Sequence, residues 1–232
     1  MRGYGQYCPI ALAAEVFAER WTPIIIRNLS LGCGRFSEIL DGAPGLPRSV
    51  LSQRLRALER SGIVRRTQTG RSTAYALSPS GRELAEVCVT LGGWGARWRE
   101  VPAEDQDPYL SLWILSRMID PGTLPRHRIV VRFTIARRPA PNRYWLVASA
   151  AGNEVCAEPP GYAEDGQVTG DTAAVVRWCA GETPLAGAQR RGELSVTGPR
   201  WLIRQLAGWG RLSPYTGTAR ASAVGSALGE VG

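Results

Sequence analysis

The chain has 232 residues, 44% of them hydrophobic, and carries a formal net charge of +8 with an isoelectric point near 9.8. This length allows one large domain or two small ones, with enough apolar side chains for buried cores. The positive charge favours an acidic partner such as nucleic acid, and the first hundred residues hold most of it, with 14 Arg against 8 acidic residues. No apolar run is long enough to span a membrane, so a membrane protein is not expected.

The cysteines predict a cytoplasmic protein with reduced thiols, because no secretory signal precedes the first of them and none forms a Cys-x-x-Cys pair. The five are Cys8, Cys33, Cys88, Cys156 and Cys179. A zinc site is not expected, since His127 is the only histidine and the cysteines lack the spacing of metal ligands. The sequence indicates no other cofactor.

Two helices are predicted before residue 33. Residues 9–20 begin with proline, are rich in alanine, and place Ile10, Ala13 and Phe17 on one side. The second helix begins at Thr22-Pro23, a favourable pair for a helix start, and stops at Gly32. We expect both helices to pack behind the segment that follows.

Residues 35–71 predict a short helix, a tight turn, a longer helix and a two-stranded hairpin. The longer helix starts at Pro47, and its leucines at 51, 55 and 58 recur at the spacing of one buried stripe. Gly62 ends it. Residues 63–67 and 73–77 then flank a polar tip, which is the pattern of a hairpin.

The outer face of the longer helix is polar and basic. It carries Ser49, Gln53, Arg56 and Arg60, with Arg48 and Ser52 near its start. Residues 35–71 hold eight Arg against three acidic residues. A solvated helix face is the alternative, but a helix, turn and wing in this order match a winged helix-turn-helix, whose helix enters the major groove of DNA while the wing follows the backbone.

A further helix is predicted from Pro79 to about residue 99. Its apolar residues recur at helical spacing: Leu84, Val87, Cys88, Leu91, Trp94 and Trp98. An apolar face on a long helix leaving a small DNA-binding domain favours pairing with a second copy; packing within one chain is the alternative. A dimer would offer two recognition helices to a pseudo-palindromic site, about one turn of DNA apart.

Several short motifs occur in order along residues 5–100. They are Tyr7-Cys8-Pro9-Ile10, Arg20-Trp21-Thr22-Pro23, Gly34-Arg35-Phe36-Ser37, Pro44-Gly45-Leu46, Leu51-Ser52-Gln53-Arg54 and Tyr75-Ala76-Leu77-Ser78. Together they closely resemble the HxlR family, bacterial winged-helix transcription regulators related to the MarR group. The resemblance implies a homodimer that binds double-stranded operator DNA.

Carried over by position, the resemblance implies two sets of DNA contacts. The residues facing the groove would be Arg48, Ser49, Ser52, Gln53 and Arg56. Those meeting phosphates would be Arg35, Ser37, Arg71, Ser72 and Thr73. Arg54 lies at the side of the helix and is ranked below them.

The resemblance also bears on Cys8, which occupies the position where several HxlR-like regulators carry a cysteine that senses oxidants or electrophiles. Reactivity there requires a stabilised thiolate, and the start of a helix is one place where this happens. An inert, half-buried thiol is the alternative.

The second half of the chain predicts an α+β domain over residues 109–212. Residues 101–108 are acidic, contain proline and form a plausible linker after a first domain over residues 1–100. The domain would have a helix from Pro108, strands at 128–135, 144–149 and 154–157, a helix capped by Asp171, a strand at 192–197 and a last helix from Pro199. Residues 213–232 are small and polar and read as a disordered tail.

This order of strands and helices is similar to that of sterol carrier protein-like domains. The resemblance implies an apolar tunnel for a lipid or another hydrophobic small molecule, which would make the domain an effector sensor. The candidate lining residues are Trp113, Phe133, Trp145 and Trp178. Aromatic residues at this spacing also fit an ordinary core, and the domain could instead widen the dimer interface.

The sequence therefore predicts a DNA-binding transcription regulator, modulated through its C-terminal domain or through Cys8. The alternative is a carrier of a lipid or small molecule, which would bind its ligand without sequence-specific binding of DNA. An enzyme is not expected, because the sequence lacks GxSxG, P-loop and GxGxxG motifs. His127 stands between two arginines at the start of a strand, where a surface residue is expected rather than a general base.

Overall fold

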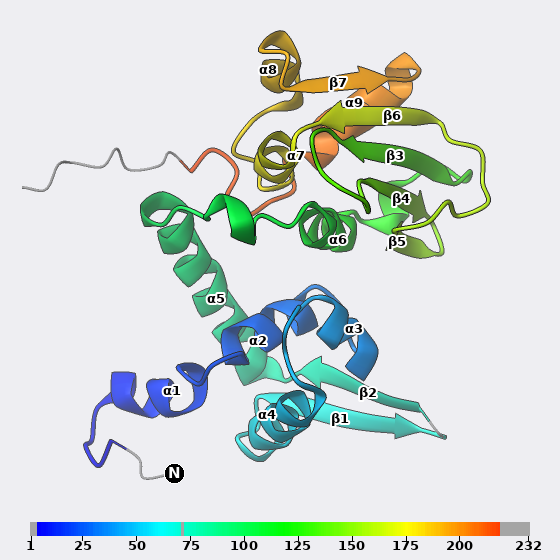
Figure 1. The fold of residues 1–232 in the computed structure, drawn as a ribbon. Helices are drawn as coiled ribbons and strands as arrows, with labels where there is room; N and C mark the ends of the chain where they lie inside the picture. The colour runs from blue at the N-terminus through cyan, green and yellow to red at the C-terminus, as the bar shows by residue number, and fades with distance from the viewer. Residues whose placement is uncertain (1–3, 71, 219–232) are drawn as a thin grey trace, which may run out of the picture. The chain divides into compact units, whose positions relative to one another are not determined.

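The computed structural model describes residues 4–70 and 72–218. Its contacts divide the chain into two compact units, Met1–Thr90 and Leu91–Gly232 (Figure 1). The division falls within helix α5 (Pro79–Trp98), earlier than the predicted linker at 101–108, which contains a short 3-10 turn, η1 (Ala103–Asp105). In the described part of the chain, no helix combines the length and apolar character needed to cross a membrane.

The first unit has the predicted order of helices followed by a hairpin. Its elements are α1 (Pro9–Phe17), α2 (Thr22–Ser30), α3 (Phe36–Asp41), α4 (Arg48–Arg60), β1 (Val64–Thr69) and β2 (Ser72–Leu77), and it continues into α5. The two strands are antiparallel, with Val64 opposite Leu77 and Arg66 opposite Tyr75. This is the winged helix-turn-helix fold that the sequence predicts.

The core of the first unit includes the predicted leucine stripe of α4 and apolar residues of α2 and α3. Leu51, Leu55 and Leu58 are buried, together with Ile25 and Ile39. The leucines recur at helical spacing, so their burial turns the opposite face of α4 outward. The core thus determines which side of this helix is available to a partner.

The second unit is an α+β domain, as predicted. Its elements are α6 (Pro108–Met118), η2 (Pro121–Thr123), β3 (Ile129–Ile135), β4 (Arg143–Ser149), β5 (Gly152–Cys156), β6 (Gly166–Gly170), α7 (Thr172–Cys179), α8 (Leu185–Arg190), β7 (Leu194–Thr197) and α9 (Arg200–Trp209). The sheet has the order β5-β4-β3-β6-β7. Strands β3 and β6 are parallel, and the other neighbouring pairs are antiparallel.

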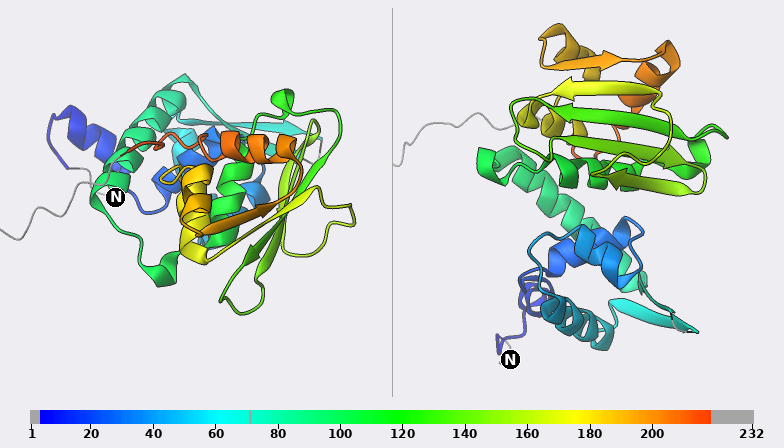
Figure 2. Two further views of the ribbon diagram at one scale, coloured as in Figure 1. Left: turned by 90° about the horizontal axis from the view of Figure 1, so that it is seen from above. Right: turned by 45° about the vertical axis from the view of Figure 1, so that its right-hand side comes forward.

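The helices of the second unit cover one face of this sheet (Figure 2). Alternate residues of β3, such as Val131 and Phe133, point into the core and meet Trp178 of α7 and Leu202 of α9. Val130, which directly precedes Val131, belongs to a smaller cluster with Trp145 and Val147 on the opposite face. The main core therefore lies between the sheet and its helices.

Strand β6 and helix α8 do not appear among the elements predicted from the sequence. β6 has glycine at both ends, which weakens a strand signal. A Cβ added at Gly166 would lie 2.4 Å from Leu202 Cδ2, and one at Gly170 would lie 2.4 Å from Leu194 Cδ2. Close packing against these two leucines requires glycine. The two glycines therefore weaken the strand signal in the sequence, but they allow β6 to pack in the fold.

Residues 213–218, the start of the predicted tail, depart from the expected disorder. Ser213 is buried, and the hydroxyl of Thr216 donates hydrogen bonds to the carbonyl oxygens of Arg211 and Ser213. A Cβ added at Gly181 would lie 2.2 Å from the Thr216 hydroxyl oxygen, so these turns pack closely on the second unit. The rest of the predicted tail, residues 219–232, lies outside the described residues.

Candidate nucleic-acid interface

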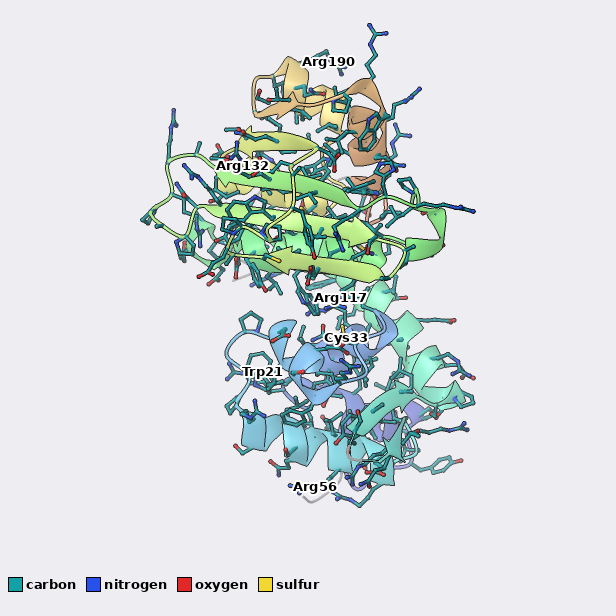
Figure 3. All side chains as sticks on the ribbon, turned by 90° about the vertical axis from the view of Figure 1, so that its right-hand side faces the viewer. Trp21, Cys33, Arg56, Arg117, Arg132 and Arg190 are labelled. Carbon is teal, nitrogen blue, oxygen red and sulfur yellow. The ribbon has the colours of Figure 1, made fainter. Side chains whose placement is uncertain are left out.

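Helix α4 carries the predicted groove-facing residues on one side. Pro47 precedes the helix with φ −65°, and the buried leucines define its inner side. On the outer side Arg48, Ser49, Gln53 and Arg56 are exposed, and Ser52 is half-buried. Figure 3 shows Arg56 pointing away from the body of the first unit. The structure thus brings these five side chains onto a single face.

Arg54, on the same helix, is held by an ion pair. Its guanidinium donates to the carboxylate of Glu19, and the two side chains are only 17% and 24% exposed. This contact agrees with the position of Arg54 at the side of the helix. The partner was not foreseen, because a pairing across 35 residues leaves no local pattern in the sequence.

The start of α3 lies next to the start of α4. The guanidinium carbon of Arg48 lies 5.2 Å from the centre of the Phe36 ring, a cation–π contact that orients this exposed arginine. Arg35 and Ser37, two of the predicted phosphate contacts, are exposed at the beginning of α3. The backbone N–H of Arg35 donates to Glu38 Oε2 at 2.9 Å, which fixes the helix start.

The hairpin supplies the wing. Ser72 is exposed and Thr73 is half-buried at the start of β2, whereas Arg71 lies outside the described residues. Arg65 and Arg66, which are exposed on β1, were not among the residues predicted to contact DNA. Two adjacent arginines beside a polar hairpin tip are the feature of the sequence that could have identified them as candidate phosphate contacts.

Electrostatically, this surface is suited to a polyanion. The exposed basic side chains just before α3 and on α4 and β1 are Arg35, Arg48, Arg56, Arg60, Arg65 and Arg66. Guanidinium groups form charge-assisted, often bidentate hydrogen bonds with phosphate oxygens and with the edge of guanine. Gln53 adds an amide, which can both donate to and accept from a base. The surface therefore combines groups for backbone contact with groups for base readout.

Cys8 is half-buried at the residue preceding α1, and its side chain makes no capping hydrogen bond. Cys33 is fully buried. Burial raises the pKa of Cys88 to about 11, and burial also raises the pKa of the Cys156 and Cys179 thiols. These three thiols are therefore poor nucleophiles. Among the described residues, no group of three or more His, Cys, Asp or Glu could hold a metal ion.

The four candidate ligand-lining residues of the second unit do not come together at one place. The rings of Phe133 and Trp178 are stacked with centroids 5.8 Å apart, and both side chains are fully buried in the main core. Trp145 lies on the other face of the sheet, where its indole N–H donates to Glu164. Trp113 is buried on α6 beneath the guanidinium of Arg117. The four side chains are thus engaged in separate contacts within the fold and do not line one common cavity.

A helix that faces outward with arginine and glutamine, followed by a hairpin wing, defines the first unit as a winged helix-turn-helix module. The model of the family described as HxlR-like helix-turn-helix matches residues 16–103. An uncharacterised HTH-type transcriptional regulator of Bacillus subtilis, YvaP, is 34% identical over 97 residues, which are 40% of this chain and 90% of that protein. The chain belongs to the HxlR family of helix-turn-helix transcription regulators.

Further relatives cover the same region. An uncharacterised HTH-type transcriptional regulator of Synechocystis sp. is 31% identical over 99 residues, or 41% of this chain and 73% of that protein. The structure of the redox regulator HypR in its oxidised form is 29% identical with a TM-score of 0.39, and the match covers 40% of this chain and all of that one. The curated relatives are named as transcriptional regulators and not as enzymes. The family match ends at residue 103, so the likeness of the second unit to sterol carrier proteins stays a prediction.

Proposed function

We propose that the protein is a homodimeric transcription regulator that binds a pseudo-palindromic operator, with α4 in the major groove and the β1–β2 wing along the phosphates. The outward face of α4 is the observation that carries this proposal. Arg56 suits a bidentate contact with guanine, and Gln53 suits one with adenine. Arg48, oriented by the Phe36 ring, stands at the start of the same face, where a recognition helix contacts base edges.

The apolar stripe of α5 supports the dimer. Val87, Leu91, Trp94 and Trp98 follow one another at intervals of four, three and four residues, and each side chain is between 47% and 59% exposed. Four large apolar groups on one side of a helix form the kind of continuous patch that marks a protein interface. A second copy related by two-fold symmetry would bury this stripe against itself.

One unpartnered polar group in the second unit supports an effector site for a hydrophobic small molecule. The indole N–H of Trp178 is buried and has no hydrogen-bond partner in the described residues. A buried donor without an acceptor costs about 1–3 kcal/mol. An apolar molecule with one carboxylate or hydroxyl oxygen would supply the acceptor, and it would regulate DNA binding only if its affinity differed between two states of the dimer.

Cys8 offers a second route for a signal. Burial disfavours the thiolates of Cys88, Cys156 and Cys179, which leaves the half-buried Cys8 as the better candidate for oxidation. Mass spectrometry after limited treatment with diamide would identify the oxidised cysteine. Modification of Cys8 with unchanged operator binding would count against a sensing role.

Selection of bound sequences from a random DNA pool, at two salt concentrations, tests the main proposal. A two-fold symmetric consensus that persists at the higher salt would support an operator-binding dimer and give its half-site spacing. Weak binding that ignores sequence and disappears with salt would indicate only a basic surface. A carrier of lipids or small molecules would then be the better hypothesis.

Calorimetric titration with decanoate tests the effector site separately. Decanoate has an apolar chain, which suits an apolar site, and one carboxylate, which can accept a hydrogen bond from the buried indole N–H. Trp178→Phe keeps an aromatic ring but removes the donor, so we expect its affinity for decanoate to fall about tenfold. Equal affinity in the two proteins would exclude the indole as the polar anchor.

A further inference from the structure

A groove runs between α1 and α4 in the first unit, away from the outward face of α4. Its volume is about 450 Å³, within the range of about 300–1,000 Å³ typical of small-molecule sites. The lining includes small apolar side chains of Ala14, Ala18 and Ala57, and Tyr4 stands at its edge. The groove therefore offers room and an apolar wall for a ligand body.

The charged groups in this groove are two carboxylates and one guanidinium. Glu15 comes from α1, Glu19 from the turn that follows α1, and Arg54 from α4. Glu15 is exposed and accepts a hydrogen bond from the backbone N–H of Tyr4 at 2.8 Å. A site with more carboxylates than cations is notable in a unit whose other surface is strongly basic, because it selects a ligand of the opposite charge.

Glu19 and Arg54 both line the groove, and their ion pair joins the turn after α1 to α4. Arg54 Nε is buried and has no hydrogen-bond partner among the described residues, so its guanidinium is only partly satisfied. A ligand cation would therefore compete with the Arg54 guanidinium for the carboxylate of Glu19. Glu15, on α1, would provide a second carboxylate.

We propose that this groove binds an organic cation, in which an ammonium or amidinium group is attached to an apolar body. The cationic group contacts Glu15 and Glu19 and displaces Arg54 from Glu19, while the apolar body lies against the alanines. Binding itself does not depend on the function proposed above. Its consequence does, since Arg54 belongs to the helix proposed to read DNA, and a released Arg54 would change operator affinity.

Calorimetric titration with three probes of one shape tests the chemical class. Phenylbutylamine is a cation at neutral pH, phenylbutanol is neutral and phenylvalerate is an anion. The wild-type protein is expected to bind the amine at least about tenfold more tightly than the alcohol, because a charge-assisted hydrogen bond to a carboxylate is stronger than a neutral one. Equal affinity for amine and alcohol would overturn the proposal.

Variants of the three charged residues should shift the affinity for phenylbutylamine in opposite directions. Glu15→Gln and Glu19→Gln each remove a carboxylate, and each should weaken binding about tenfold. Arg54→Gln removes the competitor and should tighten binding. Arg97→Gln, an exposed arginine of α5, makes the same change in net charge and should leave binding unchanged.

The exposed Glu15 provides the safest variant if loss of the Glu19–Arg54 pair disturbs folding, and circular dichroism checks each protein. An equal response of all four variants, or an unchanged affinity in Glu15→Gln, would show that the amine binds elsewhere. If these shifts occur but DNA selection yields no operator, the cation site stands and the proposed function fails. If the protein binds an operator but not the amine, the cation site alone fails.

Discussion

Trp94 and Trp98 in α5 are more than half exposed, whereas Trp178 and Phe133 in the core between the sheet and its helices are fully buried. All four were candidates for contact with a partner or a ligand, and the fold gives them different roles. In α5 the large side chains form one stripe that the described residues leave about half exposed. In the α+β domain the sheet and its helices enclose the two aromatic side chains.

This contrast shows that the spacing of apolar residues identifies one face of a helix or strand, but it does not show what packs against that face. On α4, buried leucines and exposed polar groups share one helix, so both sides can be assigned together. The strands of the second unit lack such an alternation of buried and exposed residues, because most positions of β3 and β4 are buried. The sequence therefore does not show which face of the sheet an aromatic residue occupies. Experiments that remove large side chains from each region should therefore give different kinds of loss.

The largest loss of stability is expected for Trp178→Ala. Removing a fully buried tryptophan from a core leaves a cavity and should lower the free energy of unfolding by about 3–5 kcal/mol. Urea denaturation followed by circular dichroism measures this loss. Tyr162→Ala, an exposed aromatic of the same unit, should cost at most about 1 kcal/mol. Similar losses in the two variants would contradict the assignment of Trp178 to the core.

The apolar stripe of α5 should instead control association. Trp94→Glu places a charge at the centre of the proposed interface and should raise the dimer dissociation constant about a hundredfold or more, as expected for an interface hot spot. Sedimentation equilibrium measures it. Val89→Glu is the matched control, since Val89 is similarly exposed but lies on the opposite side of the helix. Equal weakening by both variants would place the interface elsewhere.

On α4, removal of base-reading groups should reduce affinity for the operator. Gln53→Ala and Arg56→Ala are each expected to lose about 1–3 kcal/mol of operator binding, because each removes a bidentate contact with a base. Fluorescence anisotropy with the selected operator measures the loss, and a scrambled duplex is the control. Unchanged affinity for the operator in both variants would remove this face from the recognition surface.

The sequence predicts much of the first unit because its signals are local. The leucine stripe of α4, the glycine after it and the hairpin tip each lie within a few residues of the element that they specify. The ion pair of Glu19 with Arg54 joins the turn after α1 to a helix 35 residues further along the chain, and only the packed fold brings the two residues together. Local pattern therefore assigned the outer face of α4 but not the groove behind it.

In the second unit the missing information is sheet register. Trp145 stands opposite Arg132, whereas Phe133 stands opposite Tyr144, and adjacent residues of a strand point to opposite faces. Trp145 and Phe133 therefore face opposite sides of the sheet, although both are apolar residues of neighbouring strands. Strand β6 was missed for a related reason, since its glycines acquire their meaning only when Leu194 and Leu202 pack against them.

The smallest effect is expected at the wing, and it is a change in salt dependence rather than in specificity. Arg71 follows Gly70 at the hairpin tip in the sequence and lies outside the described residues. If it contacts one phosphate, Arg71→Ala should weaken binding to the operator and to a scrambled duplex alike, and the slope of log affinity against log salt should fall by about 0.9. Gln53→Ala, which removes no charge, should leave that slope unchanged while it reduces discrimination between the two duplexes. A variant at Arg71 that altered sequence preference but kept the salt slope would make the wing a reader of bases, and the division of roles between α4 and the hairpin would be wrong.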